Sequence, residues 1–280
     1  MTATATTASE RAKPAGRALT PAEGARLVAH QFRYDLLIFV RNRQSTFFTL
    51  ALPVIFLVIF AGVFRGDTTA LGNGKHVDLS AYYVPQIIAL GIVSAAFNNV
   101  VGTIIAQREM GILKRRRSTP VPAWVIVASR ALTALVISTA LVVILLAVGK
   151  VFYGVDVRLS TLPGIALSSI VAALSFCAIA YALTTFVNSQ ESATPVIQAI
   201  TLPIFFISGI FFPEEIIPGW LLTVANIFPV RHLGLALLAA FEPHPPAGGI
   251  DVRALAVIAA WGVGGLVVAT RRFTWLPRGG

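Results

Sequence analysis

Residues 107–118 read QREMGILKRRRS, and this stretch decides how the rest of the chain is arranged. It holds five cations, Arg108 and the run from Lys114 to Arg117, between two long apolar segments. Short cation-rich loops between apolar spans remain on the cytoplasmic side of a bilayer. The stretch therefore predicts a cytoplasmic loop of a membrane protein and a surface on which a second molecule can dock.

The composition supports a membrane protein. Hydrophobic residues make up 56% of the chain and charged residues only 12%, whereas about 25% of a soluble domain is charged. The formal net charge of +10 is the excess of Lys and Arg that membrane topology requires on one side. A nucleic-acid partner is therefore not needed to explain it.

Six segments are long and apolar enough to cross a bilayer, which takes about 20 residues. They run at about 46–64, 82–106, 124–148, 163–187, 193–212 and 253–270. The sequence thus predicts an all-α polytopic integral membrane protein with a six-span domain over 44–272. Arg130 lies near the cytoplasmic end of the third span, where its long side chain is expected to snorkel to the interface.

The distribution of Lys and Arg predicts the orientation. With six spans both termini share one side, and 16 of the 22 Lys and Arg residues then lie on that side. Both termini are accordingly predicted to be cytoplasmic. Residues 1–19 are predicted to be a disordered tail because they are rich in Ala, Thr and charge, and residues 273–280 are predicted to be a second cytoplasmic tail.

The segment 20–43 is predicted to be an amphipathic helix. Thr20, Pro21 and Glu23 form the pattern of a capping box with proline at the first helical position. Apolar residues fall on one side of a helical wheel and basic residues on the other, namely Val28, Phe32, Leu36 and Phe39 against Arg26, His30, Arg33 and Arg41. Such a helix is expected to lie on the inner membrane surface with its apolar face in the lipid. The alternative is a helix that only anchors the topology.

The chemistry of catalytic sites is missing from the sequence. The single cysteine, Cys177, and four scattered histidines give no metal-ligand spacing. No glycine-rich phosphate loop occurs, so this chain is not expected to bind or hydrolyse ATP. No span carries a buried Asp, Glu or Lys of the kind that proton-coupled carriers use. We therefore predict no catalytic residue, no metal and no cofactor in this chain, and an energy source outside it.

Several motifs resemble those of type-2 ATP-binding-cassette exporter permeases. They are QREMGILKRRRSTPVP at 107–122, PIFFISGIFFP at 203–213, IPGW at 217–220 and the dipeptide at Phe228 and Pro229. Arg41 and Asn42 before the first span fit as well, although Arg43 stands where relatives often have proline. The resemblance covers about residues 26–272 and is closest to drug and antibiotic exporters of the daunorubicin-resistance type.

The resemblance implies a half-transporter. It would pair with a second copy or a paralogous permease and with separate ATPase subunits, which would hold the ATP and Mg²⁺. The loop after the second span would form a coupling helix that docks on the ATPase through Glu109, Met110, Gly111, Ile112, Leu113, Lys114, Arg115, Arg116 and Arg117. Met110, Ile112 and Leu113 would offer apolar contacts and Glu109 an acceptor for a basic partner. The alternative is that the basic run only sets topology and binds anionic lipid.

Two further groups of residues are candidates for the path of the substrate. In the fifth span Thr194, Gln198, Thr201, Phe205 and Ser208 recur at helical spacing, and Asn98 belongs to a similar stripe in the second span. Helix packing is the alternative role for such small and polar residues. The resemblance also implies re-entrant external helices before the last span. There Glu214 and Glu215 are either an exit gate or a solvated loop pair.

The expected function is ATP-driven export of a hydrophobic small molecule, such as a drug or antibiotic, across a bacterial cytoplasmic membrane. Export of a lipid or a lipid-linked glycan is an alternative within the same family. An alternative from another class is a membrane scaffold that transports nothing. The apolar spans do not identify the substrate, because an apolar helix face contacts lipid and ligand alike.

Overall fold

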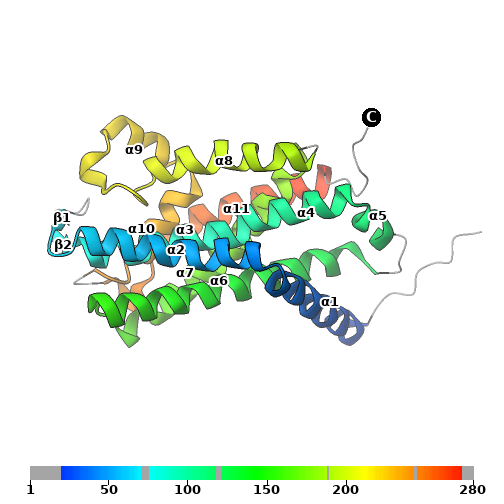
Figure 1. Cartoon of the computed structure of the whole chain (residues 1–280), viewed down its shortest axis with the longest axis horizontal. Coiled ribbons are helices and arrows are strands. Elements are labelled where there is room, and N and C mark those ends of the chain that lie inside the picture. The colour runs from blue at the N-terminus through cyan, green and yellow to red at the C-terminus, as the bar shows by residue number, and fades with distance from the viewer. Residues whose placement is uncertain (1–19, 71–75, 118–120, 188, 243–244, 273–280) are drawn as a thin grey trace, which may run out of the picture.

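The computed structural model describes residues 20–70, 76–117, 121–187, 189–242 and 245–272. Over these residues the chain is almost entirely helical, and its long helices run side by side in one elongated bundle (Figure 1). The short helix α5 (Ile112–Arg117) and the helix α1 (Pro21–Arg41) lie at one end, which we call the inner end. The strands β1 (Thr68–Ala70) and β2 (His76–Asp78) and the helix α9 (Gly219–Ala225) lie at the other, the outer end. The two predicted tails fall outside the described residues.

The N-terminal helix begins where its capping residues predict. The Thr20 side chain accepts the N–H of Glu23, and the Glu23 carboxylate accepts the N–H of Thr20 at 2.9 Å. These hydrogen bonds satisfy two backbone donors that a helix start otherwise leaves free, and they lower the pKa of Glu23. The capping box predicted from the sequence is confirmed.

Among the residues that the structure describes, five segments are long and apolar enough to cross a membrane on their own. They are α2 (Arg43–Val63), the continuous rod from Leu79 to Glu109, α6 (Ala123–Tyr153), α7 (Leu162–Leu183) with the turn η2 (Leu159–Thr161) before it, and α11 (Val252–Arg272) with the turn η4 (Ala247–Gly249) before it. These segments correspond to the first, second, third, fourth and sixth predicted spans. The all-α polytopic membrane fold is thus confirmed.

The fifth predicted span is the helix α8 (Gln190–Ile207), and it is less apolar than the others. It starts at the inner end and runs along the bundle to the outer end (Figure 1). Its 18 residues reach about 27 Å at 1.5 Å per residue. Polar residues and two prolines lower its hydropathy, so that composition alone does not mark it as a span. A helix of this kind needs cover from protein or water at its polar positions.

Short helices follow α8 at the outer end, as the re-entrant prediction requires. After the turn η3 (Glu214–Ile216), α9 and α10 (Pro229–Leu238) meet at a bend of 99°. Together they are apolar enough to count as one broken span or a re-entrant loop. The hairpin of β1 and β2, with Thr69 opposite Val77, was not expected from the sequence.

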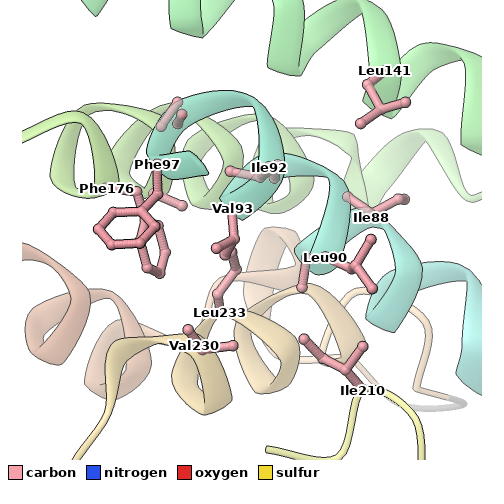
Figure 2. Packing of buried hydrophobic residues seen from close by; sticks show 14 of the residues in the cluster. Ile88, Leu90, Ile92, Val93, Phe97, Leu141, Phe176, Ile210, Val230 and Leu233 are labelled. Atoms are coloured by element: carbon pink, nitrogen blue, oxygen red, sulfur yellow. The ribbon is translucent and has the colours of Figure 1, made fainter. Parts of the chain in front are cut away.

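The rod from Leu79 to Glu109 forms the centre of the bundle. It consists of α3 (Leu79–Val93), one π-helical turn η1 (Ser94–Asn98) and α4 (Asn99–Glu109). Nearly every side chain of α3 is buried. Figure 2 shows Ile88, Ile92 and Val93 of α3 among apolar residues of the neighbouring helices, including Leu141 of α6, Phe176 of α7 and Leu233 of α10. This rod reaches from the outer loops to α5, so it links the two ends of the molecule.

The helices α7 and α11 pack closely because small residues line their contact. A Cβ atom added at Gly262 would lie 2.4 Å from the Ser175 hydroxyl, and one at Gly265 would lie 2.8 Å from the backbone nitrogen of Ile179. Close backbone approach of this kind is how membrane helices gain packing energy without a hydrophobic driving force. The last span is thereby fixed against the fourth.

Candidate functional site

A sharp turn separates α4 from α5 at the inner end. Gly111 has φ of +69° and lies between Glu109, where α4 ends, and Ile112, where α5 begins. This left-handed conformation is costly for any residue with a Cβ atom. The turn lets α5 leave the axis of α4 (Figure 1), so a glycine at this position is what allows a separate helix to form.

The side chains predicted to dock on a partner differ in exposure. Met110 is 62% exposed, Ile112 is half-buried and Arg115 is exposed. Leu113 is buried, at 2% exposure, within the main hydrophobic core. The expectation that Leu113 offers an apolar contact to a partner is therefore wrong, because its side chain fixes α5 to the bundle instead. The side chains of Lys114, Arg116 and Arg117 lie outside the described part of the chain.

Arg108 is buried at the end of α4 and holds the end of α7. Its guanidinium donates to the carbonyl oxygen of Thr184 at 2.9 Å and to that of Val187. Free carbonyls at a helix C-terminus carry partial negative charge, so a buried cation is stabilised there. The sequence grouped Arg108 with the cations of the loop after the second span. In the structure only 2% of the residue is exposed, so Arg108 acts within the protein.

Glu109 holds the start of α8. Its carboxylate accepts the backbone N–H of Gln190, the first residue of α8, at 2.8 Å. Free N–H groups make a helix N-terminus favourable for negative charge. Ser189 caps the same helix, and the Ser192 hydroxyl completes a capping box. Glu109 was predicted to accept from a basic partner, but in this chain its carboxylate already bonds to α8.

Arg108 and Glu109 therefore form one clamp on the connection between α7 and α8. The cation binds the negative end of α7 and the anion binds the positive end of α8. Both residues lie immediately before the Gly111 turn that starts α5. The clamp therefore joins the segment just before α5, the predicted docking helix, to the start of α8, the helix with the polar stripe.

A buried ion pair attaches α1 to α6. Asp35 of α1 lies 3.5 Å from the guanidinium of Arg130 and also accepts from Gln31 at 3.1 Å and from Ser129 at 3.4 Å. Asp35 is 1% exposed and Arg130 is 8% exposed. Arg130 was expected to snorkel toward the membrane interface, and this expectation is wrong because the side chain turns to a carboxylate 95 residues away.

The apolar face of α1 also packs on protein at its C-terminal end. Phe39 is buried against Ala95 and Ile137, and Leu36 packs beside them. For these residues the expected insertion into lipid is wrong, because α1 turns this side to the bundle. Tyr34, Leu37, Ile38 and Val40 are exposed instead. These four residues are the apolar surface that α1 leaves free.

Replacement of Asp35 by asparagine tests the attachment of α1. Breaking a buried ion pair by removing one partner costs about 3 kcal/mol, or roughly 5–10 °C in the midpoint of thermal unfolding for a protein of this size. We expect that shift for the purified protein in detergent. The further change Arg130→Met, which removes the unpaired charge, should restore most of the loss. An unchanged midpoint in Asp35→Asn would show that α1 is held by apolar packing alone.

The polar residues predicted to line a substrate path do not share one environment. Thr201, Phe205 and Ser208 are buried, whereas Thr194 and Gln198 are exposed. The Thr201 hydroxyl donates to the carbonyl of Ile197 at 2.8 Å, which is a packing arrangement within α8. Asn98 lies in the π-helical turn, and its Oδ1 atom is buried without a hydrogen-bond partner. The predicted stripe on α8 is therefore partly buried inside the bundle and partly exposed on its surface.

The two glutamates at the outer end are held by other parts of the chain. Glu214 lies 3.0 Å from the guanidinium of Arg231, which also donates to Asn226 at 2.8 Å. Glu215 accepts from the Thr69 hydroxyl of β1 at 3.2 Å. Tyr82 of α3 donates to the carbonyl of Gly209 at 2.6 Å. These bonds fasten the segment after α8 to the outer ends of α3, α10 and β1.

Metal-binding groups do not gather in the described part of the chain. Within the ranges that the structure describes, no three His, Cys, Asp or Glu side chains lie close enough together to hold an ion. Cys177 is buried in α7 as a free thiol.

Comparisons with known proteins place the chain among transporters. The family model described as ABC-2 type transporter matches residues 28–241. The chain is 24% identical over 157 residues to the probable multidrug ABC transporter permease YbhR of Escherichia coli strain K12, a match covering 56% of this chain and 42% of the relative. The protein of the same name from Escherichia coli O157:H7 matches equally. The alignment thus spans less than half the length of these relatives.

Proposed function

Because the chain belongs to the ABC-2 type transporter family, we propose that it is the membrane-spanning permease of an ATP-driven exporter whose ATPase subunits are separate polypeptides. The observation that carries the proposal is the clamp of Arg108 and Glu109 beside the exposed Met110 and the short helix α5. The clamp joins the surface around Met110, which a partner can reach, to α8, which runs from the inner end of the bundle to the outer end. ATP and Mg²⁺ would be held by the ATPase, since this sequence has no phosphate loop.

Export of a hydrophobic small molecule, such as a drug or antibiotic, is the activity we propose. It is supported by the relative named as a probable multidrug permease and by the resemblance of residues 107–122 to the drug-exporter type. Export of a lipid or a lipid-linked glycan is the alternative within the family. Drug resistance and membrane lipid composition, both measured in a deletion strain, separate the two.

The proposed cycle passes force through the clamp. ATP binding would move the ATPase surface on which Met110 and Ile112 rest, and the Gly111 turn would pass that movement to Arg108 and Glu109. The N-terminus of α8 is bonded to Glu109 and would move with them. A second copy or a paralogous permease would complete the translocation path. The protein would lie in a bacterial cytoplasmic membrane with α5 and both termini in the cytoplasm, in agreement with the excess of cations at the inner end.

The exposed part of the α8 stripe supports a role in the path between two permeases. Gln198 is exposed on α8 although an amide is costly in lipid. If it lines the path, Gln198→Leu changes the substrate range, and we expect the resistance conferred against at least one drug to change about fourfold or more at unchanged protein level. The measurement is a panel of inhibitory concentrations in cells with matched membrane expression. A change in expression alone would assign Gln198 to packing.

Purification from the native host tests the proposed function. The chain is extracted in mild detergent, with and without prior crosslinking, and proteins present at stoichiometric level are identified by mass spectrometry. We expect a companion with a phosphate-binding loop and ATPase activity. If both samples lack such a companion, the protein is a scaffold or a carrier of another kind, and the proposal is wrong.

A further inference from the structure

A cavity of about 480 Å³ lies at the inner end of the bundle, between α1, α4, α6 and α8 and beside α5. Binding sites for small molecules have volumes of about 300–1,000 Å³. The cavity is distinct from a larger groove of about 790 Å³ between α6, α7 and α11, whose lining is mainly aliphatic. Its position next to the predicted docking helix makes it the place where a ligand can contact α1, α5 and α8 at once.

The charged groups in the cavity wall neutralise each other. Asp35 and Arg130 both line the cavity, and their side chains form the ion pair between α1 and α6. Among the described residues that line the cavity, Asp35 and Arg130 are the charged ones. An ion that entered would lose its hydration without gaining a free counter-charge, which is strongly unfavourable. The cavity therefore favours an uncharged ligand.

Polar groups with unused hydrogen-bonding capacity also line the cavity. Gln107 is only 6% exposed, and its side chain makes no hydrogen bond to any other residue that the structure describes. Because the amide faces the cavity, a ligand that replaces water as its hydrogen-bond partner gains about 0.5–1.5 kcal/mol. Thr194 of α8 brings a hydroxyl into the same cavity, likewise unbonded within the described ranges. These groups match hydroxyl or amide groups on a ligand.

The rest of the wall is apolar. Phe39 of α1, Ile137 of α6 and Met110 beside α5 face the same space. A ligand that fills it must present an apolar body to these side chains and hydrogen-bonding groups to Gln107 and Thr194. We propose that this cavity is a binding site for an uncharged amphipathic molecule with several hydroxyl or amide groups, and that such molecules are the substrate class of the exporter.

The position of the site also connects ligand binding to the clamp. Gln107 directly precedes Arg108, and Gln190, whose N–H bonds to Glu109, is part of the cavity wall. A bound ligand therefore contacts residues next to both halves of the clamp. The assignment as a substrate site depends on the proposed function, whereas ligand binding to the cavity does not.

Direct binding to the purified full chain in lipid nanodiscs tests the site. The probe is 4-methylumbelliferyl glucoside, which joins an apolar ring system to an uncharged sugar, and its partner is 4-methylumbelliferyl sulfate, which has the same ring system and a negative charge. Equilibrium dialysis with fluorescence detection gives both dissociation constants. We expect the glucoside to bind at least tenfold more tightly than the sulfate. We also expect Gln107→Leu and Thr194→Leu each to weaken glucoside binding about tenfold.

The matched control is Thr139→Leu, the same substitution at an exposed position of α6 outside the cavity, which should leave glucoside binding unchanged. Absence of glucoside binding, equal binding of the two probes, or equal binding by wild type and both cavity variants would overturn the site. The assay contains no ATPase and no ATP. Intact binding in a protein that fails to co-purify with an ATPase would therefore refute the proposed function and leave the binding site standing.

Discussion

Replacement of Arg108 by methionine is expected to abolish ATP-driven transport and to release the connection between α7 and α8. The guanidinium bonds to the carbonyl oxygens of Thr184 and Val187 in a buried position. A hydrogen bond to a charged group contributes about 1.5–3 kcal/mol, and methionine replaces none of them. Transport should fall below about a tenth of the wild-type rate, since the end of α7, which leads into α8, loses its link to α4.

Hydrogen–deuterium exchange measures the released connection directly. Peptides covering the end of α7 and the start of α8 should exchange at least tenfold faster in Arg108→Met, because local opening becomes less costly. Arg33→Met is the matched control, since Arg33 is an exposed cation on α1, and it should change neither exchange nor transport. Unchanged exchange together with normal transport in Arg108→Met would refute the clamp.

Changes at Gly111 and Glu109 are expected to uncouple transport from ATP hydrolysis. Gly111 has φ of +69°, and an added Cβ would meet no atom within 4 Å. The cost of Gly111→Val thus comes from the backbone, at roughly 1–2 kcal/mol, and we expect it to change the direction in which α5 leaves α4. Glu109→Ala removes the acceptor for the first N–H of α8. In both variants we expect the membrane level to stay normal while transport per ATP hydrolysed falls at least tenfold.

The matched control for the glycine is Gly264→Val on α11. Gly264 also has open space around an added Cβ but an ordinary helical φ, so this variant should remain coupled. Reconstituted vesicles that contain the permease and its ATPase give both rates in one preparation. Normal coupling in Gly111→Val and Glu109→Ala would remove α5 from the transmission path.

The parts of the fold that follow from local sequence were predictable. The capping box of Thr20 and Glu23 lies within four residues of chain, and it starts α1 as predicted. Five of the six spans follow from apolar runs alone. The helix α8 was also predicted. Its mean hydropathy does not show which of its residues face the bundle, because the value averages over residues covered by protein and residues exposed on the surface.

The parts of the candidate site that depend on distant residues were not predictable. Arg108 was interpreted as one more cation of a basic loop. The carbonyl oxygens that accept its hydrogen bonds lie 76 and 79 residues further along the chain, where no local pattern indicates them. The ion pair of Asp35 and Arg130 joins residues 95 positions apart, and no local pattern in either helix indicates it. The sequence did contain a signal for the clamp of Arg108 and Glu109. Arg108 and Glu109 lie just before Met110 and Gly111, where the apolar second span ends.

Site-specific crosslinking shows whether an ATPase contacts this permease at α5. Cys177 is the single cysteine and is buried in α7, so Cys177→Ala gives a background for Met110→Cys, at a position 62% exposed beside α5. Trp220→Cys, 69% exposed at the outer end, is the control. In membranes of the native host, a bifunctional thiol–amine reagent should join residue 110 but not residue 220 to a protein with a phosphate-binding loop. Failure of residue 110 to crosslink in cells that still export, or an equal crosslink from residue 220, would contradict the account.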